Sequence, residues 1–320
     1  MEKEIFQFIN LLKNSANILL VTHQKPDGDA IGSLLSFGTV LEKLKKKKTL
    51  VAKDLSIKYK FLPRFDQIKE EINQLKEFDL CIILDCGQLS QTGFPILTNL
   101  SIPLVNIDHH FTNSCWGDIN LVQKDSSATC EILYNLFQFI NEKSDLPIKI
   151  DKDIATYLLL GISTDTGSFK HSNTTLKTLR IASKLLLKGG KLLKISKEIY
   201  NIKSLSTLKL WGKVFSNISY NKKFKIVISV ITKKDFKECG ATSEDLEGAI
   251  YFLNAIPEAK AILLLSEQNE KEIKGSLRTE NEKIDVSKLA RFFNGGGHKK
   301  AAGFVIKGSL LFDGKRWKVV

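Results

Sequence analysis

Short apolar runs alternate with longer amphipathic stretches in the first half of the chain. Runs of strand length cover residues 18–21, 80–84 and 103–107. Helical spacing of apolar residues predicts helices over 4–12, 30–44, 126–140, 154–160 and 175–187, and residues 88–100 could supply a short one. Almost wholly apolar strands that alternate with helices predict an α/β domain built on a doubly wound, mostly parallel sheet.

Polar residues at the ends of these segments suggest where the helices begin and end. We expect Asp29 near the N-cap of the helix over 30–44, and Ser126 or Ser127 as the cap of the helix that follows. We expect Gly161 to break the helix over 154–160, so that residues 162–168 form a polar loop.

The second half of the chain predicts a smaller α/β domain. A segment rich in Lys, Leu and Ser spans residues 191–213 and resembles a helical linker. Beyond it, the pattern predicts strands over 224–230, 261–265, 274–278 and finally 304–306, with helices over 244–254 and 286–293. The predicted organisation is a first domain over residues 1–190, a helical linker over 191–214 and a second domain over 215–320.

Composition bounds the class of protein. Hydrophobic residues make up 43% of the 320, enough for two domains with cores, and no apolar run approaches the roughly 18–20 residues of a membrane span. The N-terminal residues do not resemble a secretory signal. The five cysteines show no Cys-x-x-Cys spacing, so we expect reduced, packed thiols in a cytoplasmic protein and no zinc site built on them.

The net charge of +13 comes mostly from lysine. A basic balance favours anionic partners such as nucleic acid or phosphorylated small molecules. A compositional bias toward lysine explains the charge equally well, so charge alone does not decide the function.

Acidic and imidazole side chains recur where the apolar runs end. They are His23, Asp27, Asp29, Asp85, Asp108, His109, His110 and Asp165. Taken singly, each motif can be a capped turn or a hydrogen-bonded loop. In a parallel sheet, however, the loops that follow the strands share one edge, where converging carboxylates repel one another unless cations neutralise them. Two divalent ions about 3.5–4 Å apart would do so. Mixed carboxylate and imidazole donors favour manganese over magnesium or calcium, while zinc, cobalt and iron stay open.

A second constellation lies in the predicted second domain. The glycines Gly295, Gly296 and Gly297 precede His298, and their backbone N–H groups could approach a phosphate closely. Arg278 could add a bidentate contact. A lone glycine triplet is ordinarily a flexible turn. Because the acidic motifs belong to the other domain, we expect an active site in the cleft between the two.

These motifs resemble those of the DHH phosphoesterase superfamily. The match rests on His23-x-x-x-Asp27-x-Asp29, Asp85, Asp108-His109-His110 and Asp165, while Gly295-Gly296-Gly297-His298 followed by Ala301-Ala302-Gly303 resembles the DHH-associated C-terminal domain. One departure is Lys170, where the superfamily commonly has an arginine.

The resemblance implies a role for each site residue. His23, Asp27 and Asp85 would bind one ion. Asp29, Asp85, His109 and Asp165 would bind the other. Asp108 would orient its neighbours, in particular His109, and His110 would lie near the scissile phosphate. Arg278, His298 and the glycine backbone would hold a substrate phosphate.

Length and motif order are similar to the bacterial nanoRNase and pAp phosphatase branch of the superfamily. This similarity implies manganese-dependent hydrolysis of very short RNA oligonucleotides and of 3′-phosphoadenosine 5′-phosphate (pAp), with magnesium or cobalt as other possible ions and a homodimer as the assembly. One rival hypothesis is a phosphodiesterase for linear or cyclic dinucleotides. The other is a basic, metal-stabilised module that binds nucleic acid without hydrolysing it.

Overall fold

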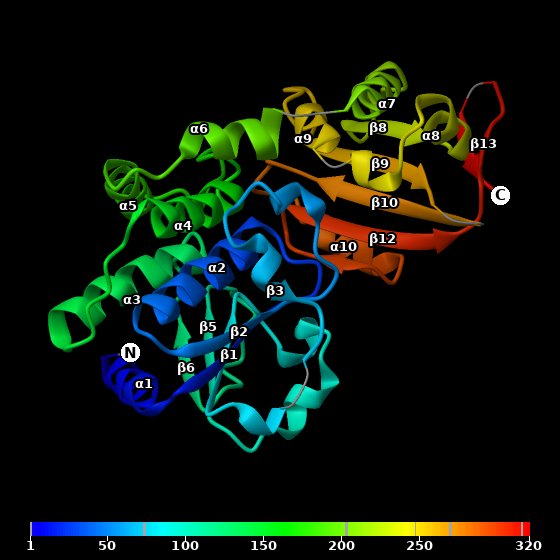
Figure 1. Ribbon diagram of the computed structural model, residues 1–320. Helices are drawn as coiled ribbons and strands as arrows, with labels where there is room; N and C mark the ends of the chain where they lie inside the picture. Colours follow the sequence, from blue (N-terminus) through cyan, green and yellow to red (C-terminus); the bar gives the residue numbers. More distant parts are fainter. Residues whose placement is uncertain (1, 73–74, 202–203, 247, 269–270, 315) are drawn as a thin grey trace. The chain divides into compact units, whose positions relative to one another are not determined.

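A computed structural model describes residues 2–72, 75–201, 204–246, 248–268, 271–314 and 316–320 (Figure 1). The chain divides into two compact units, residues 1–202 and 203–320. This boundary falls inside the segment that the sequence assigned to a helical linker.

The first unit is built on a six-stranded sheet in which all strands are parallel. Its strands are β1 (Asn17–Thr22), β2 (Lys47–Val51), β3 (Ile68–Lys69), β4 (Leu80–Leu84), β5 (Leu104–Asp108) and β6 (Ile119–Val122). They lie in the order β3-β2-β1-β4-β5-β6, so the strand order reverses between β1 and β4. Such a reversal opens a crevice at the carboxyl ends of the strands, where α/β proteins bind their ligands. The parallel α/β fold expected from the sequence is confirmed.

Different elements cover the two faces of this sheet (Figure 1). The helices are α1 (Glu2–Asn14), α2 (Gly28–Lys43), α3 (Thr129–Lys143), α4 (Lys152–Asp165), α5 (Leu176–Leu187) and α6 (Leu192–Ile195), followed by the π-helical segment η6 (Ser196–Asn201). Helices α1 to α5 share one core with Ile18 and Leu20 of β1. Leu19 and Val21 of the same strand face a second, smaller core. Short 3₁₀ turns are η1 (Ile57–Tyr59), η2 (Phe65–Gln67), η3 (Leu75–Glu77), η4 (Leu89–Thr92) and η5 (Pro95–Asn99). The alternation along β1 shows why its continuous apolar run is buried on both faces.

The two predictions about helix starts have different outcomes. Asp29 lies near the N-cap of α2, as expected; the cap itself is Asp27, whose Oδ1 accepts the backbone N–H groups of Asp29 at 2.9 Å and Ala30 at 3.1 Å. The expectation that Ser126 or Ser127 caps the next helix was wrong. Helix α3 begins at Thr129, and its N-cap, Ala128, makes no side-chain capping bond. A carboxylate from α2 accepts the first N–H groups of α3 instead, so a local cap is replaced by a tertiary contact.

Gly161 does not break its helix, contrary to expectation. Helix α4 continues through it to Asp165, and the predicted loop over 162–168 is helical in its first half. Gly161 lies where α4 packs closely against α2 and the start of α3. A β-carbon at this position would come within 2.3 Å of Asp29 Oδ1 and 2.4 Å of Cys130 Sγ. The glycine therefore serves close packing rather than a turn.

Other expectations failed because short elements carry little pattern. Residues 88–100 form the turns η4 and η5 instead of one helix, and β2, β3 and β6 were not predicted.

Among the cysteines, Cys115 is exposed rather than packed. None of the helices that the structure describes is long and apolar enough to cross a membrane.

The second unit is a smaller α/β domain, built on a six-stranded sheet with both parallel and antiparallel strands. Its strands are β7 (Ser219–Asn221), β8 (Ile226–Ile231), β9 (Ala261–Glu267), β10 (Glu272–Arg278), β11 (Gly296–Gly297) and β12 (Ala301–Lys307), in the order β11-β12-β10-β9-β8-β7. Only the β8–β9 pair in this described sheet is parallel. The helical elements are α7 (Leu205–Ser216), α8 (Lys233–Cys239), η7 (Ser243–Leu246), α9 (Ala249–Leu253) and α10 (Val286–Phe292). The helix predicted over 244–254 is thus divided between η7 and α9. The strand predicted over 304–306 is not the last, because the hairpin of β13 (Leu310–Phe312) and β14 (Trp317–Val319) follows it.

Candidate metal centre

Neighbouring strands of the first unit bring the predicted acidic and imidazole residues together. His23 follows β1, Asp85 follows β4 and Asp108 ends β5, and these three strands are adjacent. Helix α2 supplies Asp27 and Asp29 from its start, and α4 supplies Asp165 from its last turn. The convergence occurs at the crevice where the strand order reverses.

Three groups of side chains place one ligand atom each within 4.8 Å of one another. The groups are His23, Asp27 and Asp85; Asp29, His109 and Asp165; and Asp85, His109 and His110. The first two correspond to the two ion sites that the family resemblance implied, except that Asp85 is not part of the second. Asp85 Oδ2 lies 3.8 Å from His23 Nε2, and Asp85 Oδ1 lies 3.6 Å from His109 Nε2. Its two oxygens therefore face different groups, which suits a ligand shared by two ions.

Asp85 also has an unusual backbone conformation. Its φ of +57° lies in the left-handed region, which aspartate and asparagine tolerate better than most residues with a β-carbon. The Asp85 N–H donates to Ile107 O at 2.9 Å, so the turn is tied to the neighbouring strand. Such strain concentrates at functional sites. The left-handed turn at the end of β4 thus accompanies a carboxylate that lies beside His23 and His109.

Burial and mutual repulsion make the carboxylates hold protons unusually tightly. Burial, together with the charges of neighbouring aspartates, raises the pKa of Asp29 and of Asp165 to about 7 and that of Asp85 to about 8. The pKa of His109 rises to about 11 although burial opposes it, because Asp165 lies 3.1 Å from its Nε2 and two further aspartates are near. Protons here offset a negative charge that divalent cations would neutralise better. Four carboxylates and two imidazoles form a donor set that fits such cations.

The structure corrects the role expected for Asp108. Its Oδ1 accepts a hydrogen bond from His110 Nδ1 at 2.7 Å, whereas His109 Nδ1 lies 3.3 Å from the Ser126 carbonyl oxygen. Asp108 thus orients His110 rather than His109, because side chains two residues apart in an extended segment point the same way. The bond to Asp108, against the effect of burial, raises the pKa of His110 to about 9. Asn113 Nδ2 donates to the other Asp108 oxygen at 2.6 Å.

A pocket of about 480 Å³ opens beside these groups. It is lined by His23, Gln24, Lys25, Asp27, Asp85, Gln91 and His110. Lys25, Gln91 and Asn113 were not identified from the sequence. Lys25 stands in the same loop as His23 and could have been proposed as a cation for an anionic substrate. Asn113 and Gln91 belong to no motif and become visible only through tertiary contacts.

The predicted phosphate-binding residues gather at one end of the second unit's sheet. The register of β10 and β12 pairs Arg278 with Ala301, and Ala301 exchanges backbone hydrogen bonds with His298 at 2.7 and 3.2 Å. The glycines before His298 form β11 and the residue that precedes it. Gly297, at φ +136°, has no room for a β-carbon, whereas a β-carbon on Gly296 would meet nothing within 4 Å. The Arg278 guanidinium lies 5.8 Å from the centre of the Tyr251 ring.

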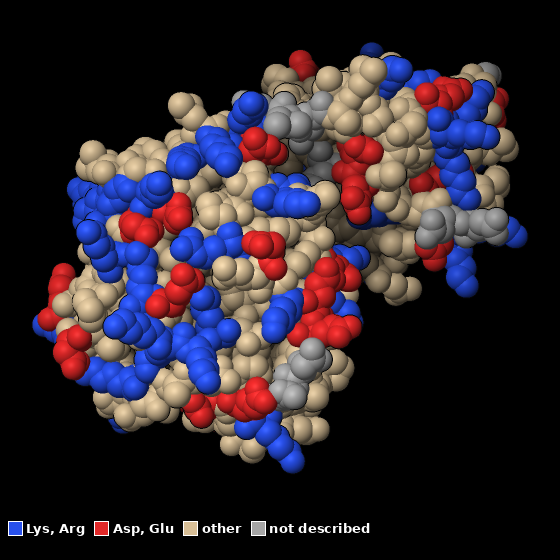
Figure 2. Space-filling view, viewed as in Figure 1, with Lys and Arg blue, Asp and Glu red and all other residues tan. Residues whose placement is uncertain are grey.

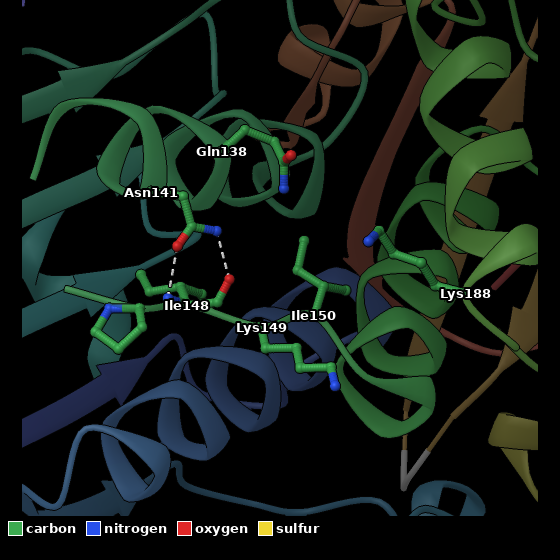
Figure 3. A pocket seen from close by; sticks show the side chains of 7 residues that line it. Gln138, Asn141, Ile148, Lys149, Ile150 and Lys188 are labelled. Carbon is green, nitrogen blue, oxygen red and sulfur yellow. Dashed lines mark hydrogen bonds between the residues drawn. The ribbon is translucent and has the colours of Figure 1, made fainter. Parts of the chain in front are cut away.

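A separate pocket of about 280 Å³ has a different character (Figure 3). Its described lining residues, from Gln138 to Lys188, include no histidine or carboxylate. The Asn141 amide is bonded to both backbone groups of Ile148, at 2.7 and 2.5 Å. Lysines and arginines in the first unit are spread among acidic residues on the face that Figure 2 shows. Neither feature competes with the strand-end cluster as a catalytic site.

Comparisons with known proteins match both halves of the chain. The DHH family, N-terminal domain, matches residues 17–162, and the DHHA1 domain matches residues 223–314. The bifunctional oligoribonuclease and PAP phosphatase NrnA of Thermus thermophilus is 30% identical over 294 residues, which cover 91% of this chain and 84% of that protein. NrnA of Bacillus subtilis is 28% identical over 305 residues, with coverages of 95% and 92%. The crystal structure of an exopolyphosphatase-related protein from Bacteroides fragilis gives a TM-score of 0.88 at 28% identity, with coverages of 97% and 92%.

Proposed function

The chain belongs to the DHH family and is a hydrolytic phosphoesterase, and from this premise we propose that it cleaves very short RNA oligonucleotides and pAp with the help of two divalent metal ions. The observation that supports the proposal most strongly is the convergence of Asp29, Asp85 and Asp165 with His109 at the strand ends. Two buried carboxylates and a partly buried one, all with raised pKa values, form a site that divalent cations would stabilise.

The proposed ligands follow the two groups of side chains. His23, Asp27 and Asp85 would hold one ion. Asp29, His109 and Asp165 would hold the other, with Asp85 shared between them. Manganese is the proposed ion, because the donors mix nitrogen and oxygen. Bound divalent ions would supply Lewis acidity and lower the pKa of an attacking water.

His110 is the proposed catalytic group on the substrate side. Asp108 accepts its Nδ1–H and Asn113 fixes Asp108 from the other side, so the imidazole is held in one orientation beside the pocket. The bond to Asp108, against the effect of burial, raises the pKa of His110. The imidazole can donate a hydrogen bond to a phosphate oxygen and a proton to the leaving oxygen.

In the proposal, the second unit selects the substrate. Arg278 would grip a phosphate with two parallel hydrogen bonds, and His298 with the glycine N–H groups would complete the anion site. Very short RNA and pAp both carry a second phosphate that such a site could hold. The names of the Thermus and Bacillus relatives support these two substrates. The cleft between the domains, expected from the sequence, stays a prediction.

A time course with manganese would test the proposal. The purified chain is incubated with an end-labelled RNA pentamer, with pAp and with a cyclic dinucleotide, in parallel with Asp85→Asn. We expect pentamer and pAp to be consumed and the variant to be inactive. If the wild type left both untouched, the proposed function would fail. Faster turnover of the cyclic dinucleotide would overturn the choice of substrate.

A further inference from the structure

Thr129 is the first residue of α3 and is fully buried. Its backbone N–H donates to Asp29 Oδ2 at 2.5 Å, and its hydroxyl donates to Asp85 Oδ1 at 3.0 Å. These two aspartates are 56 residues apart in the sequence and come from different elements, α2 and the end of β4. One threonine therefore contacts two carboxylates of the candidate metal centre.

The two aspartates belong to different groups of proposed ligands. Asp85 is grouped with His23 and Asp27, whereas Asp29 is grouped with His109 and Asp165. The N–H of Cys130 donates to the second oxygen of Asp29 at 2.9 Å, so both Asp29 oxygens are held by the start of α3. The hydroxyl of Thr129 then fixes Asp85 relative to that same helix end. Thr129 therefore links the two groups by a hydrogen bond to one aspartate of each.

The hydrogen bond from Thr129 differs from those of Thr156 and Thr166. Thr156 and Thr166 donate to backbone carbonyls four residues earlier in their own helix, which is the common pattern. Thr129 lies at a helix start and directs its hydroxyl to a distant carboxylate instead. Its sequence neighbours gave no sign of this, because the contact spans 44 residues.

A second set of contacts holds the start of α3 in place. The buried Glu131 accepts hydrogen bonds from Ser127 Oγ at 2.7 Å and from Thr178 Oγ1 at 2.8 Å. Lys177 lies 3.2 Å from its other oxygen. Thr178 belongs to the capping box that begins α5. The residues just before α3 and the start of α5 thus fix the helix end from which Thr129 reaches the site.

We propose that Thr129 is a positioning residue that sets the geometry of a two-ion centre by holding Asp29 and Asp85 together. The inference rests on the proposed metal centre and adds a residue that no ligand motif contains. Loss of a group that hydrogen-bonds to a metal ligand typically lowers metal affinity or activity by about 10–100-fold. We expect loss of the Thr129 hydroxyl to weaken Mn²⁺ binding by about 10–100-fold.

The test compares four variants by calorimetric titration of chelator-treated protein with Mn²⁺. Thr129→Val removes the hydroxyl while keeping the shape, Thr129→Ser keeps the hydroxyl, and Thr129→Ala serves if the valine variant does not fold. Thr39→Val is the matched control, because Thr39 is buried in α2 and its hydroxyl has no hydrogen-bond partner among the described residues. Circular dichroism confirms that each variant is folded.

We expect weak binding in Thr129→Val and Thr129→Ala, and near-normal binding in Thr129→Ser and Thr39→Val. The KM for pAp should stay unchanged at saturating Mn²⁺, because Thr129 does not line the pocket. Wild-type affinity in Thr129→Val, or an equal loss in Thr39→Val, would overturn the positioning role while leaving the metal centre intact. Failure of the wild type to bind Mn²⁺ would instead overturn the proposed centre, and this inference with it.

Discussion

The two candidate binding regions of this chain are built in opposite ways. The strand-end cluster of the first unit is buried and cross-linked, with Asp29 and Asp85 at most 1% exposed. In the glycine-rich region of the second unit, the residues Gly296, Gly297 and His298 are exposed. The first region concentrates negative charge, whereas the second offers N–H groups, an imidazole and a guanidinium. The contrast agrees with the proposed cation site in the first unit and the proposed anion site in the second.

The largest expected effect is that of Asp85→Asn. Asparagine tolerates the left-handed backbone of this position, so the change removes charge rather than conformation. Because Asp85 is shared by both proposed ion sites, we expect turnover of pAp to fall by more than ~100-fold, beyond the usual loss for an outer-shell partner. Parallel Mn²⁺ titration should show that fewer ions bind. The surface variant Asp145→Asn is the control, and wild-type turnover in Asp85→Asn would contradict the proposed centre.

Changes at Arg278 should affect substrate without affecting metal. A charge-assisted hydrogen bond contributes about 1.5–3 kcal/mol, so Arg278→Ala should raise the KM for pAp by roughly 10–100-fold. Arg278→Lys should recover only part of the loss, because lysine lacks the bidentate fork. Mn²⁺ affinity should stay at its wild-type value in both. Arg316→Ala, in the hairpin of the same unit, is the control, and a loss of Mn²⁺ affinity in Arg278→Ala would contradict the division of roles.

Gly161→Ala tests how tightly the first region is packed. The added β-carbon would meet Asp29 Oδ1 and Cys130 Sγ at 2.3 and 2.4 Å, so the helices must shift. Overpacking of this kind costs about 1–3 kcal/mol of unfolding free energy. Chemical denaturation would measure the loss, and Mn²⁺ binding should weaken with it because Asp29 is displaced. An unchanged unfolding free energy would show that α2 and α4 are more loosely packed than described.

The acidic cluster should make both the thermal stability and the Mn²⁺ affinity of the chelator-treated protein depend on pH. The pKa values of Asp29, Asp85 and Asp165 are raised to about 7–8, so these groups stabilise the fold at low pH and that contribution is lost as pH rises through 7–8. Thermal stability in chelator should therefore fall from about pH 4, the ordinary pKa of an aspartate, up to about pH 8. Mn²⁺ affinity should rise over the same range, by up to about tenfold per pH unit for each proton released. Calorimetry in buffers of different ionisation enthalpy counts those protons, and a count of zero would contradict the shared protonation.

The smallest expected effect is that of Gly296→Ala. A β-carbon there meets nothing within 4 Å, so the unfolding free energy should change by less than about 0.5 kcal/mol. Mn²⁺ binding should be unaffected, and any change should appear in the KM for pAp. A loss comparable to that of Gly161→Ala would remove the contrast between the two regions.

The sequence predicted the parts of the molecule that local pattern determines. The apolar runs that became β1, β4 and β5 are long and continuous, and the polar residues after them could be placed at one sheet edge by topology alone. The short strands β2 and β6 carry weaker patterns and were missed. Contacts that depend on tertiary structure were also missed, such as Thr129 with Asp85 and Asn113 with Asp108. The start of α3 was misassigned for the same reason, because its cap comes from Asp29, 100 residues earlier.

The order of synthesis gives the strand arrangement a further consequence. His23, Asp27 and Asp29 leave the ribosome early, but the strand beside β1 on the catalytic side is β4, about 60 residues later. Asp165 arrives only with the last turn of α4. A nascent chain therefore carries half of the proposed ligands long before it can enclose an ion. Metal capture would be a late step of biogenesis, stabilising the finished domain rather than guiding its folding.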